Sequence, residues 1–143
     1  MSINFSHISG PSHYSKSFFE DEDNYELPHN SIFRTHRVNL PIYPYREEII
    51  SCIREHPVTI INGSTGCGKS TQVPQYIYED CTKRREACNI LVSQPRKIAA
   101  ITVAQRVSLE RGVTVGEEIG YQVALNKLTC ESEDVSTSIT YCT

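Results

Sequence analysis

The sequence lacks the excess of positive charge that marks many nucleic-acid-binding proteins. Its 14 lysines and arginines are outnumbered by 17 aspartates and glutamates, and the formal net charge is −3. Proteins that bind nucleic acid through bulk charge normally carry a basic surface over phosphate. This balance argues against that mode of binding and leaves room only for a local basic stripe.

Long apolar runs and paired cysteines are also missing. No stretch is long and apolar enough to span a membrane, and residues 1–24 contain no basic segment followed by an apolar one. The cysteines are irregularly spaced, without a C-x-x-C pair or a nearby histidine doublet, which argues against a zinc site. We expect a soluble cytoplasmic protein with free thiols, at Cys52, Cys67, Cys81, Cys88, Cys130 and Cys142.

The first 39 residues are polar and carry an acidic run at residues 20–23. They show no sustained hydrophobic period, so they bury too little apolar surface to offset the entropy of ordering, and we predict a disordered tail over 1–39. Aromatic residues flank the acidic run in a pattern that a partner protein could bind, at Tyr14, Phe18, Phe19 and Tyr25. A solvated tail and a partner-binding segment both fit this composition.

From Leu40 onward, apolar runs alternate with helical patterns. Pro44 suits a first helical turn, and Tyr45, Ile49 and Ile53 repeat at four-residue spacing, which predicts a helix. The β-branched run that follows, residues 57–64, predicts a buried strand of a parallel sheet. A glycine-rich stretch comes next, and a helix is predicted from about Lys69 to Lys83.

The second half of the chain repeats this alternation. A strand is predicted over 89–94, before a helix over 96–112 that ends at Gly112 and presents one apolar face, formed by Ala100, Val103, Ala104 and Val107. A weaker strand pattern covers 118–125 and a β-rich run covers 137–143. The alternation predicts an α/β fold with an open parallel sheet and flanking helices. Since the last strand coincides with the last residues, we expect an incomplete sheet.

The glycine-rich loop, residues 63–70, matches the pattern G-x-x-x-x-G-K-[ST] between a predicted strand and a predicted helix. Glycines allow backbone N–H groups and the helix N-terminus to face an anion. Lys69 would reach the β- and γ-phosphates, and the Ser70 hydroxyl would ligate Mg2+. A plain glycine turn explains neither residue, so we predict a site for ATP and Mg2+, formed by Gly63, Ser64, Thr65, Gly66, Cys67, Gly68, Lys69 and Ser70.

Hydrolysis needs more than this loop. Phosphoryl transfer also requires an acidic residue on a later strand, a group that orients water and usually an arginine finger. No apolar strand after Ser70 ends in a carboxylate, and the later acidic residues fall in polar or loop-like stretches, at Glu117, Glu118, Glu131, Glu133 and Asp134. We therefore predict that the chain alone hydrolyses ATP poorly.

Several stretches together resemble, in sequence and spacing, the opening of the DEAH family of ATP-dependent RNA helicases. They are "GSTGCGKSTQVPQYI", "SQPRKIAAITVAQRV", "GYQV" with "ITYCT", and "LPIYPYREEII" before the first strand. The resemblance covers residues 40–143 and implies the N-terminal part of the first RecA-like lobe. The D-E-A-H box, the second lobe and any Tudor domain are absent from the sequence, so the resemblance implies a truncated, inactive fragment of a parent enzyme.

The resemblance also assigns roles to single residues. Gly66, Gly68, Lys69 and Ser70 would bind phosphates and Mg2+, with Thr71 supporting them. Arg106 would stack on the adenine, and Arg96 and Thr143 would contact the phosphates of single-stranded RNA. Without the resemblance, Arg96 fits a helix-capping or surface arginine, and Arg106 fits an exposed residue on a helix face.

One departure narrows the resemblance. Most DEAH members carry a basic residue after "GY", whereas this sequence reads "GYQVALNK". Together with "REEII" and "QPRKIAA", this feature resembles the Tudor-domain-containing DEAH helicases of the Spindle-E type. That subfamily acts in germ-cell small-RNA (piRNA) silencing of transposons, which implies a cytoplasmic, perinuclear germ-granule (nuage) location.

Two other interpretations start from the same sequence. The chain could be a non-catalytic fragment whose tail, residues 1–39, is a protein-interaction module. It could also be a small nucleotide kinase, but such an enzyme needs an arginine-rich lid near its end, and residues 126–143 are short of arginine.

Overall fold

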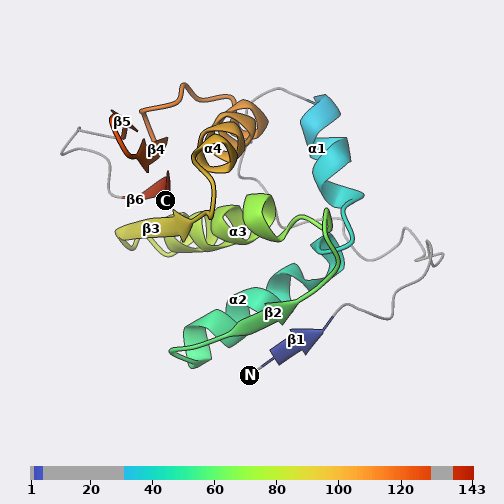
Figure 1. Ribbon diagram of the computed structural model, residues 1–143. Coiled ribbons are helices and arrows are strands. Elements are labelled where there is room, and N and C mark those ends of the chain that lie inside the picture. Colours follow the sequence, from blue (N-terminus) through green and yellow to red (C-terminus); the bar gives the residue numbers. More distant parts are fainter. Residues whose placement is uncertain (1, 5–30, 130–136) are drawn as a thin grey trace.

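The computed structural model describes residues 2–4, 31–129 and 137–143, and its fold is α/β, as predicted (Figure 1). A mostly parallel sheet is flanked by helices. Most of the predicted disordered tail, with its acidic run and aromatic residues, lies outside the described residues, as does Cys130. Among the helices that are described, none is long and apolar enough to cross a membrane.

The chain enters the fold through three short helical elements. They are α1 (Ser31–Val38), the 3-10 helix η1 (Tyr43–Tyr45) and α2 (Arg46–Glu55). Pro44 lies in η1, at the start of the predicted helix, where its missing N–H costs no hydrogen bond. Because α1 falls within residues 1–39, helical structure begins nearer the N-terminus than the predicted boundary at Leu40.

The main sheet has the strand order β3-β6-β4-β5. Strand β6 (Thr137–Cys142) runs parallel to both β3 (Cys88–Ser93) and β4 (Ile119–Val123), so the predicted parallel arrangement is confirmed. Strand β5 (Asn126–Leu128) forms an antiparallel hairpin with β4 and was not predicted. Its three residues are exposed and show no hydrophobic alternation that would mark a strand.

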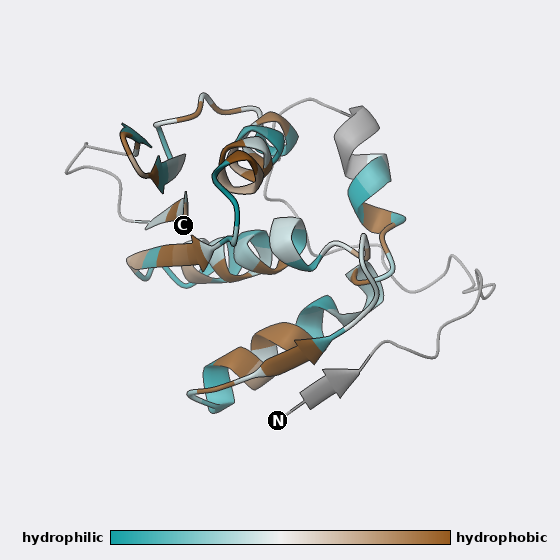
Figure 2. Cartoon of the chain, in the orientation of Figure 1, coloured by the Kyte–Doolittle hydropathy of each residue, from teal (hydrophilic) through white to brown (hydrophobic). Residues whose placement is uncertain are grey.

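Two longer helices link the strands. Helix α3 (Lys69–Lys83) has the predicted bounds, and α4 (Lys97–Arg111) ends where Gly112 adopts a left-handed conformation, with φ of 70°. Ala100, Ala104 and Val107 of α4 are fully buried against the apolar side chains of β4 and β6. Figure 2 shows apolar residues along β2 and β3 and on parts of α2 and α4.

Residues 57–64 contain a strand in a parallel pair, as predicted, but this strand is not buried as expected and lies outside the four-stranded sheet. Strand β2 (Ile60–Asn62) pairs in parallel with β1 (Ser2–Asn4) in a separate two-stranded sheet. Figure 1 shows these two strands beside α2, apart from β3. Ile61 packs against the apolar face of α2, whereas Ile60 is 60% exposed. A continuous apolar run does not distinguish a strand covered on both faces from one covered on a single face.

Candidate functional site

The glycine-rich loop joins β2 to the first turn of α3, in the predicted strand-loop-helix context. Gly66 and Gly68 have φ values of 82° and 105°, which side-chain-bearing residues rarely adopt. A Cβ atom added at Gly68 would lie 3.0 Å from Cγ2 of Ile42 and 3.2 Å from Cδ1 of Leu40. The loop therefore depends on glycine at position 68 for both its conformation and its packing.

Residues that precede η1 contact one side of the glycine-rich loop. The Ile42 amide donates a hydrogen bond to the Cys67 carbonyl at 3.3 Å, and the side chains of both residues are buried. On the outer side, Ser64, Thr65 and Gly66 are exposed to solvent. The loop is thus anchored on one side and exposed to solvent on the other.

The side chain of Lys69 turns back into the curve of the loop. Its Nζ donates hydrogen bonds to the carbonyl oxygens of Gly63 at 2.6 Å and Ser64 at 2.9 Å, and lies 3.5 Å from Sγ of Cys67. These oxygens are neutral acceptors, so an anion in the loop would offer the ammonium stronger, charge-assisted partners. The position of Lys69 fits phosphate recognition.

The first turn of α3 supplies the other groups that a phosphate-magnesium site needs. Ser70 is exposed, and the Thr71 hydroxyl donates to the Gly68 carbonyl at 3.2 Å. The first N–H groups of a helix have no intrahelical partner and favour an anion. An ammonium, a serine hydroxyl, helix N–H groups and a glycine cradle together fit a nucleotide phosphate with Mg2+. Among the described residues, no three His, Cys, Asp or Glu side chains cluster as a metal site.

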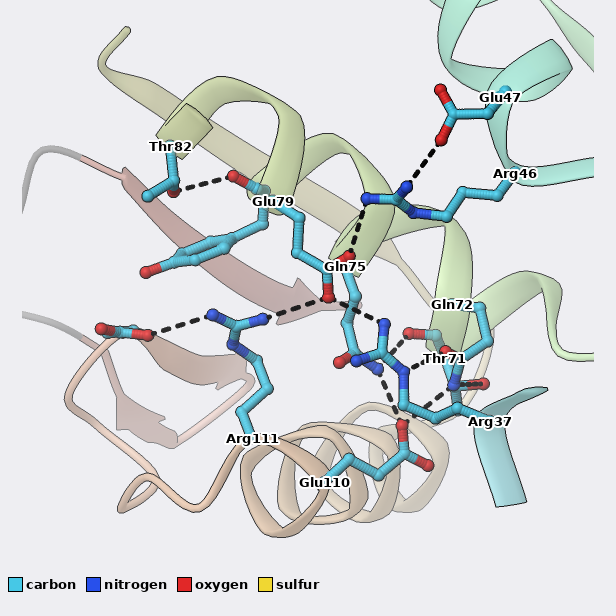
Figure 3. A network of polar contacts seen from close by, with 12 residues as sticks. Arg37, Arg46, Glu47, Thr71, Gln72, Gln75, Glu79, Thr82, Glu110 and Arg111 are labelled. Atoms are coloured by element: carbon cyan, nitrogen blue, oxygen red, sulfur yellow. Dashed lines mark hydrogen bonds and ion pairs between the residues drawn. The ribbon is translucent and has the colours of Figure 1, made fainter. Parts of the chain in front are cut away.

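Arg106 is part of α4 and pairs with Glu110. Glu110 belongs to the buried polar network that Figure 3 shows. Nε of Arg106 donates to Glu110 at 2.7 Å, and Glu110 also accepts hydrogen bonds from Gln72 and Gln75 of α3. At the far end of the network, Glu79 forms ion pairs with arginines of three helices, Arg37, Arg46 and Arg111.

No carboxylate of this network was among the site residues predicted from the sequence. Polar residues at positions 72, 75 and 79 follow helical spacing on a face of α3 that turns out to be buried. This helical spacing of polar residues was the sequence signal that could have indicated the network, because buried polar groups require hydrogen-bond partners.

Arg96 and Thr143 lie at the same edge of the sheet. Arg96 follows β3 and occupies the N-cap of α4 with its side chain exposed, while Thr143 follows β6 and its amide donates to the Gln122 carbonyl at 3.3 Å. The ends of β3 and β6 are joined by the hydrogen bond from the Gln94 amide to the Cys142 carbonyl, 2.7 Å long. Both residues are therefore placed at the carboxyl edge of the parallel strands.

The described acidic residues between α4 and β4 make contacts of their own. A carboxylate oxygen of Glu117 accepts a hydrogen bond from the Thr114 amide at 3.0 Å, and Glu118 lies 3.8 Å from Arg111. Glu131, Glu133 and Asp134 lie outside the described residues. The cysteines that are described carry free thiols.

No protein-family model matches the chain. Curated relatives do: the chain is 50% identical over 123 residues to the "Probable ATP-dependent RNA helicase spindle-E" of Drosophila grimshawi, which covers 86% of this chain and 8% of that protein. Proteins of the same name match at 54% identity in Drosophila virilis, over 73% of this chain and 7% of the relative, and at 47% in Aedes aegypti, over 84% and 8%. The chain thus spans less than a tenth of the length of these relatives.

Proposed function

This chain is a spindle-E-like helicase sequence, and from that premise we propose that its glycine-rich loop binds the phosphates of ATP together with Mg2+. The observation that carries the proposal is the position of Lys69, whose ammonium lies inside a loop bent by two glycines of positive φ. On binding, Lys69 exchanges the carbonyl oxygens of Gly63 and Ser64 for phosphate oxygens, which are charged and hold it more strongly.

The remaining phosphate contacts come from the backbone and from the first turn of α3. The amides of the glycine-rich loop and the α3 N-terminus would donate to phosphate oxygens, and the hydroxyl of Ser70, in the first turn of α3, would hold Mg2+. Mg2+ held there would supply positive charge that neutralises the phosphate oxygens. Thr71 keeps this turn in shape through its hydrogen bond to the Gly68 carbonyl.

At the other sites, Arg106 stacks on the adenine, and Arg96 and Thr143 contact the phosphates of single-stranded RNA. Two observations support the RNA contacts: the Arg96 side chain is exposed, and both residues lie at one edge of the sheet. Because the whole chain has a net charge of −3, RNA binding here depends on such local contacts rather than on bulk charge.

For the longer protein we propose an ATP-dependent DEAH-box RNA helicase that remodels RNA or RNA–protein complexes. The finer resemblance supports a role in germline piRNA-mediated silencing, in cytoplasmic germ granules. The carboxylates of Glu117 and Glu118 already contact the Thr114 amide and the Arg111 guanidinium. We therefore expect that this chain, although it binds ATP, hydrolyses it poorly.

Binding of a fluorescent ADP with Mg2+ to the 143-residue chain tests the proposal. Lys69→Ala should abolish binding while circular dichroism shows an unchanged fold, because the hydrogen bonds of the Lys69 ammonium to other described residues are all within the glycine-rich loop. Ser70→Ala should weaken binding more in the presence of Mg2+ than in its absence. Equal binding by the wild-type chain and by Lys69→Ala would show that the loop is not the nucleotide site.

A further inference from the structure

Glu110 is a buried carboxylate that accepts hydrogen bonds from side chains of two helices, α3 and α4. It lies one turn after Arg106 on α4, and its side chain is 2% exposed. Figure 3 shows it between α4 and the glutamines of α3. A buried negative charge is costly unless ion pairs and hydrogen bonds compensate it, so its partners are held firmly.

The first carboxylate oxygen faces Arg106. Oε1 accepts a hydrogen bond from Nε of Arg106 at 2.7 Å, while the arginine side chain stays 37% exposed. Nη2 of the same guanidinium lies 3.3 Å from Nδ1 of His36 on α1. The guanidinium is therefore fixed by its inner edge and still reaches solvent, which is the disposition that a planar group needs to stack on a ligand ring.

The second carboxylate oxygen faces α3, the helix that follows the glycine-rich loop. Oε2 accepts from Nε2 of Gln72 at 2.9 Å and from Nε2 of Gln75 at 2.8 Å. Gln72 Nε2 also lies 3.3 Å from the Thr71 hydroxyl, which in turn donates to the Gly68 carbonyl. An unbroken series of polar contacts thus joins Arg106 to the glycine-rich loop.

This series of polar contacts fixes both the distance and the orientation of Arg106 relative to the first turn of α3. Gln72 and Arg106 are on different helices, and the same carboxylate bonds both of them. Charge-assisted hydrogen bonds are short and directional, so Glu110 sets where Arg106 lies relative to the first turn of α3. A rigid spacing of this kind lowers the entropic cost when one ligand contacts both places.

The geometry points to Glu110 as a positioning residue that holds the Arg106 guanidinium at a set spacing from the glycine-rich loop, so that one nucleotide contacts both with its base and its phosphates. The inference rests on the proposed function and deepens it. Glu110 itself touches no ligand.

The test separates base recognition from phosphate recognition. Fluorescent ADP bound to the full chain with Mg2+ is displaced by unlabelled ADP or by inorganic pyrophosphate, which has no base. Arg106→Ala should weaken ADP by about three- to thirtyfold, the range for loss of an arginine–ring contact, and leave pyrophosphate unchanged. Glu110→Gln should weaken ADP by about three- to tenfold with pyrophosphate again unchanged, because the glutamine keeps the shape but not the charge that holds Arg106.

A double variant shows whether the two residues act together. In the Arg106→Ala background, Glu110→Gln should cause no further loss of ADP affinity relative to pyrophosphate, since the group that it positions is gone. Independent, additive losses would overturn the inference. So would an equal loss for ADP and pyrophosphate in Glu110→Gln, which is the result expected from a general effect on folding.

Two more variants keep the test decisive. If Glu110→Gln does not fold, Glu110→Asp retains the buried charge but is one methylene shorter, and it should show the same selective loss of ADP affinity. Glu79→Gln is the matched control, because it neutralises another buried carboxylate of the network, whose ion pairs among the described residues are with Arg37, Arg46 and Arg111. It should lower stability without changing the ratio of ADP to pyrophosphate affinity.

The outcomes also separate this inference from the proposed function. If wild-type and Lys69→Ala chains bind ADP alike, the proposed site is wrong and the role of Glu110 fails with it. If binding depends on Lys69 but the ratio of ADP to pyrophosphate affinity is the same in Glu110→Gln as in the wild type, only the role of Glu110 is overturned.

Discussion

The hydroxyl group of Tyr141 donates a hydrogen bond to the carbonyl oxygen of Ser70 at 3.1 Å. In a regular α-helix that carbonyl accepts from the amide four residues later, which here belongs to Pro74, inside α3. Proline has no amide hydrogen, so the helix leaves the Ser70 carbonyl without its usual donor. A fully buried tyrosine from β6 supplies the missing bond and ties the last strand to the first turn of α3.

Tyr141→Phe tests this relationship. The substitution removes the hydroxyl but keeps the ring, so we expect the free energy of unfolding to fall by about 1 kcal/mol, the usual net value of one hydrogen bond. In the Pro74→Ala background the helix regains an amide donor for the Ser70 carbonyl, and the same substitution should then cost clearly less. Urea unfolding of the four proteins gives the coupling. If Tyr141→Phe cost the same in both backgrounds, the Tyr141 hydroxyl would not be replacing the amide that Pro74 lacks.

The same tyrosine should make stability depend on alkaline pH. Burial raises the pKa of Tyr141, and burial likewise raises the pKa of Tyr76. The folded state therefore keeps protons that the unfolded chain releases near pH 10. Their contribution is complete below about pH 10 and is lost as the pH rises further. Urea unfolding between pH 8 and 11 should show this decline, and Tyr141→Phe should make it shallower; a decline of unchanged slope would argue against the assignment.

The two glycines of positive φ should respond differently to alanine. Gly68→Ala combines an unfavourable conformation with a Cβ only 3.0 Å from Ile42, whereas a Cβ at Gly66 meets nothing within 4 Å. We expect Gly66→Ala to cost about 1–2 kcal/mol from conformation alone and Gly68→Ala to cost at least 1 kcal/mol more. Thermal or urea unfolding without nucleotide measures both, so that lost binding does not enter. Equal costs would show that Ile42 and Leu40 move aside freely.

The elements that the sequence predicted well have local causes. Helix α3 begins directly after the glycine-rich loop at Lys69, and α4 ends at Gly112, whose φ of 70° suits glycine. Each of these signals spans only a few residues of chain. The glycine-rich loop was also predictable, because its conformation and its lysine are encoded in consecutive residues.

What the sequence did not predict depends on contacts between distant residues. Arg37 and Glu79 are 42 positions apart, and nothing in either local pattern indicates the other. The same reason applies to β2. Its apolar residues fit a buried strand, but they do not indicate which other strand pairs with it. The role of Glu110 was missed because, in sequence, it is one of several charged residues at the end of an amphipathic helix.

Glu79 and Asp80 are adjacent carboxylates on α3 that should contribute unequally to stability. Glu79 faces arginines whose side chains are as little as 4% exposed, whereas Arg54, a partner of Asp80, is 47% exposed. Glu79→Gln leaves Arg37 and Arg111 buried beside a neutral amide, and we expect a loss of about 3 kcal/mol. Arg54→Ala removes a solvent-screened pair, while Arg84 still contacts Asp80, so the expected loss is clearly smaller than that of Glu79→Gln.

The measurement is urea unfolding at low and high salt. The cost of Arg54→Ala should shrink further at 1 M NaCl, because exposed ion pairs are screened, whereas the cost of Glu79→Gln should hardly change. A salt-sensitive Glu79→Gln would mean that water reaches this cluster of arginines.

Cys81 should be a slow nucleophile despite being a free thiol. Burial and a hydrogen bond with Cys88 raise the pKa of Cys81 to about 11, and only the thiolate reacts with alkylating reagents. Iodoacetamide labelling followed residue by residue with mass spectrometry should show Cys81 reacting slowly at pH 8–9 and faster toward pH 11, while in urea-unfolded chain it reacts like an ordinary thiol. Cys88→Ala removes the second cause, so it should lower the pKa of Cys81 and speed labelling at pH 9. Labelling at pH 9 that is unchanged by Cys88→Ala would show that burial alone sets the reactivity of this thiol.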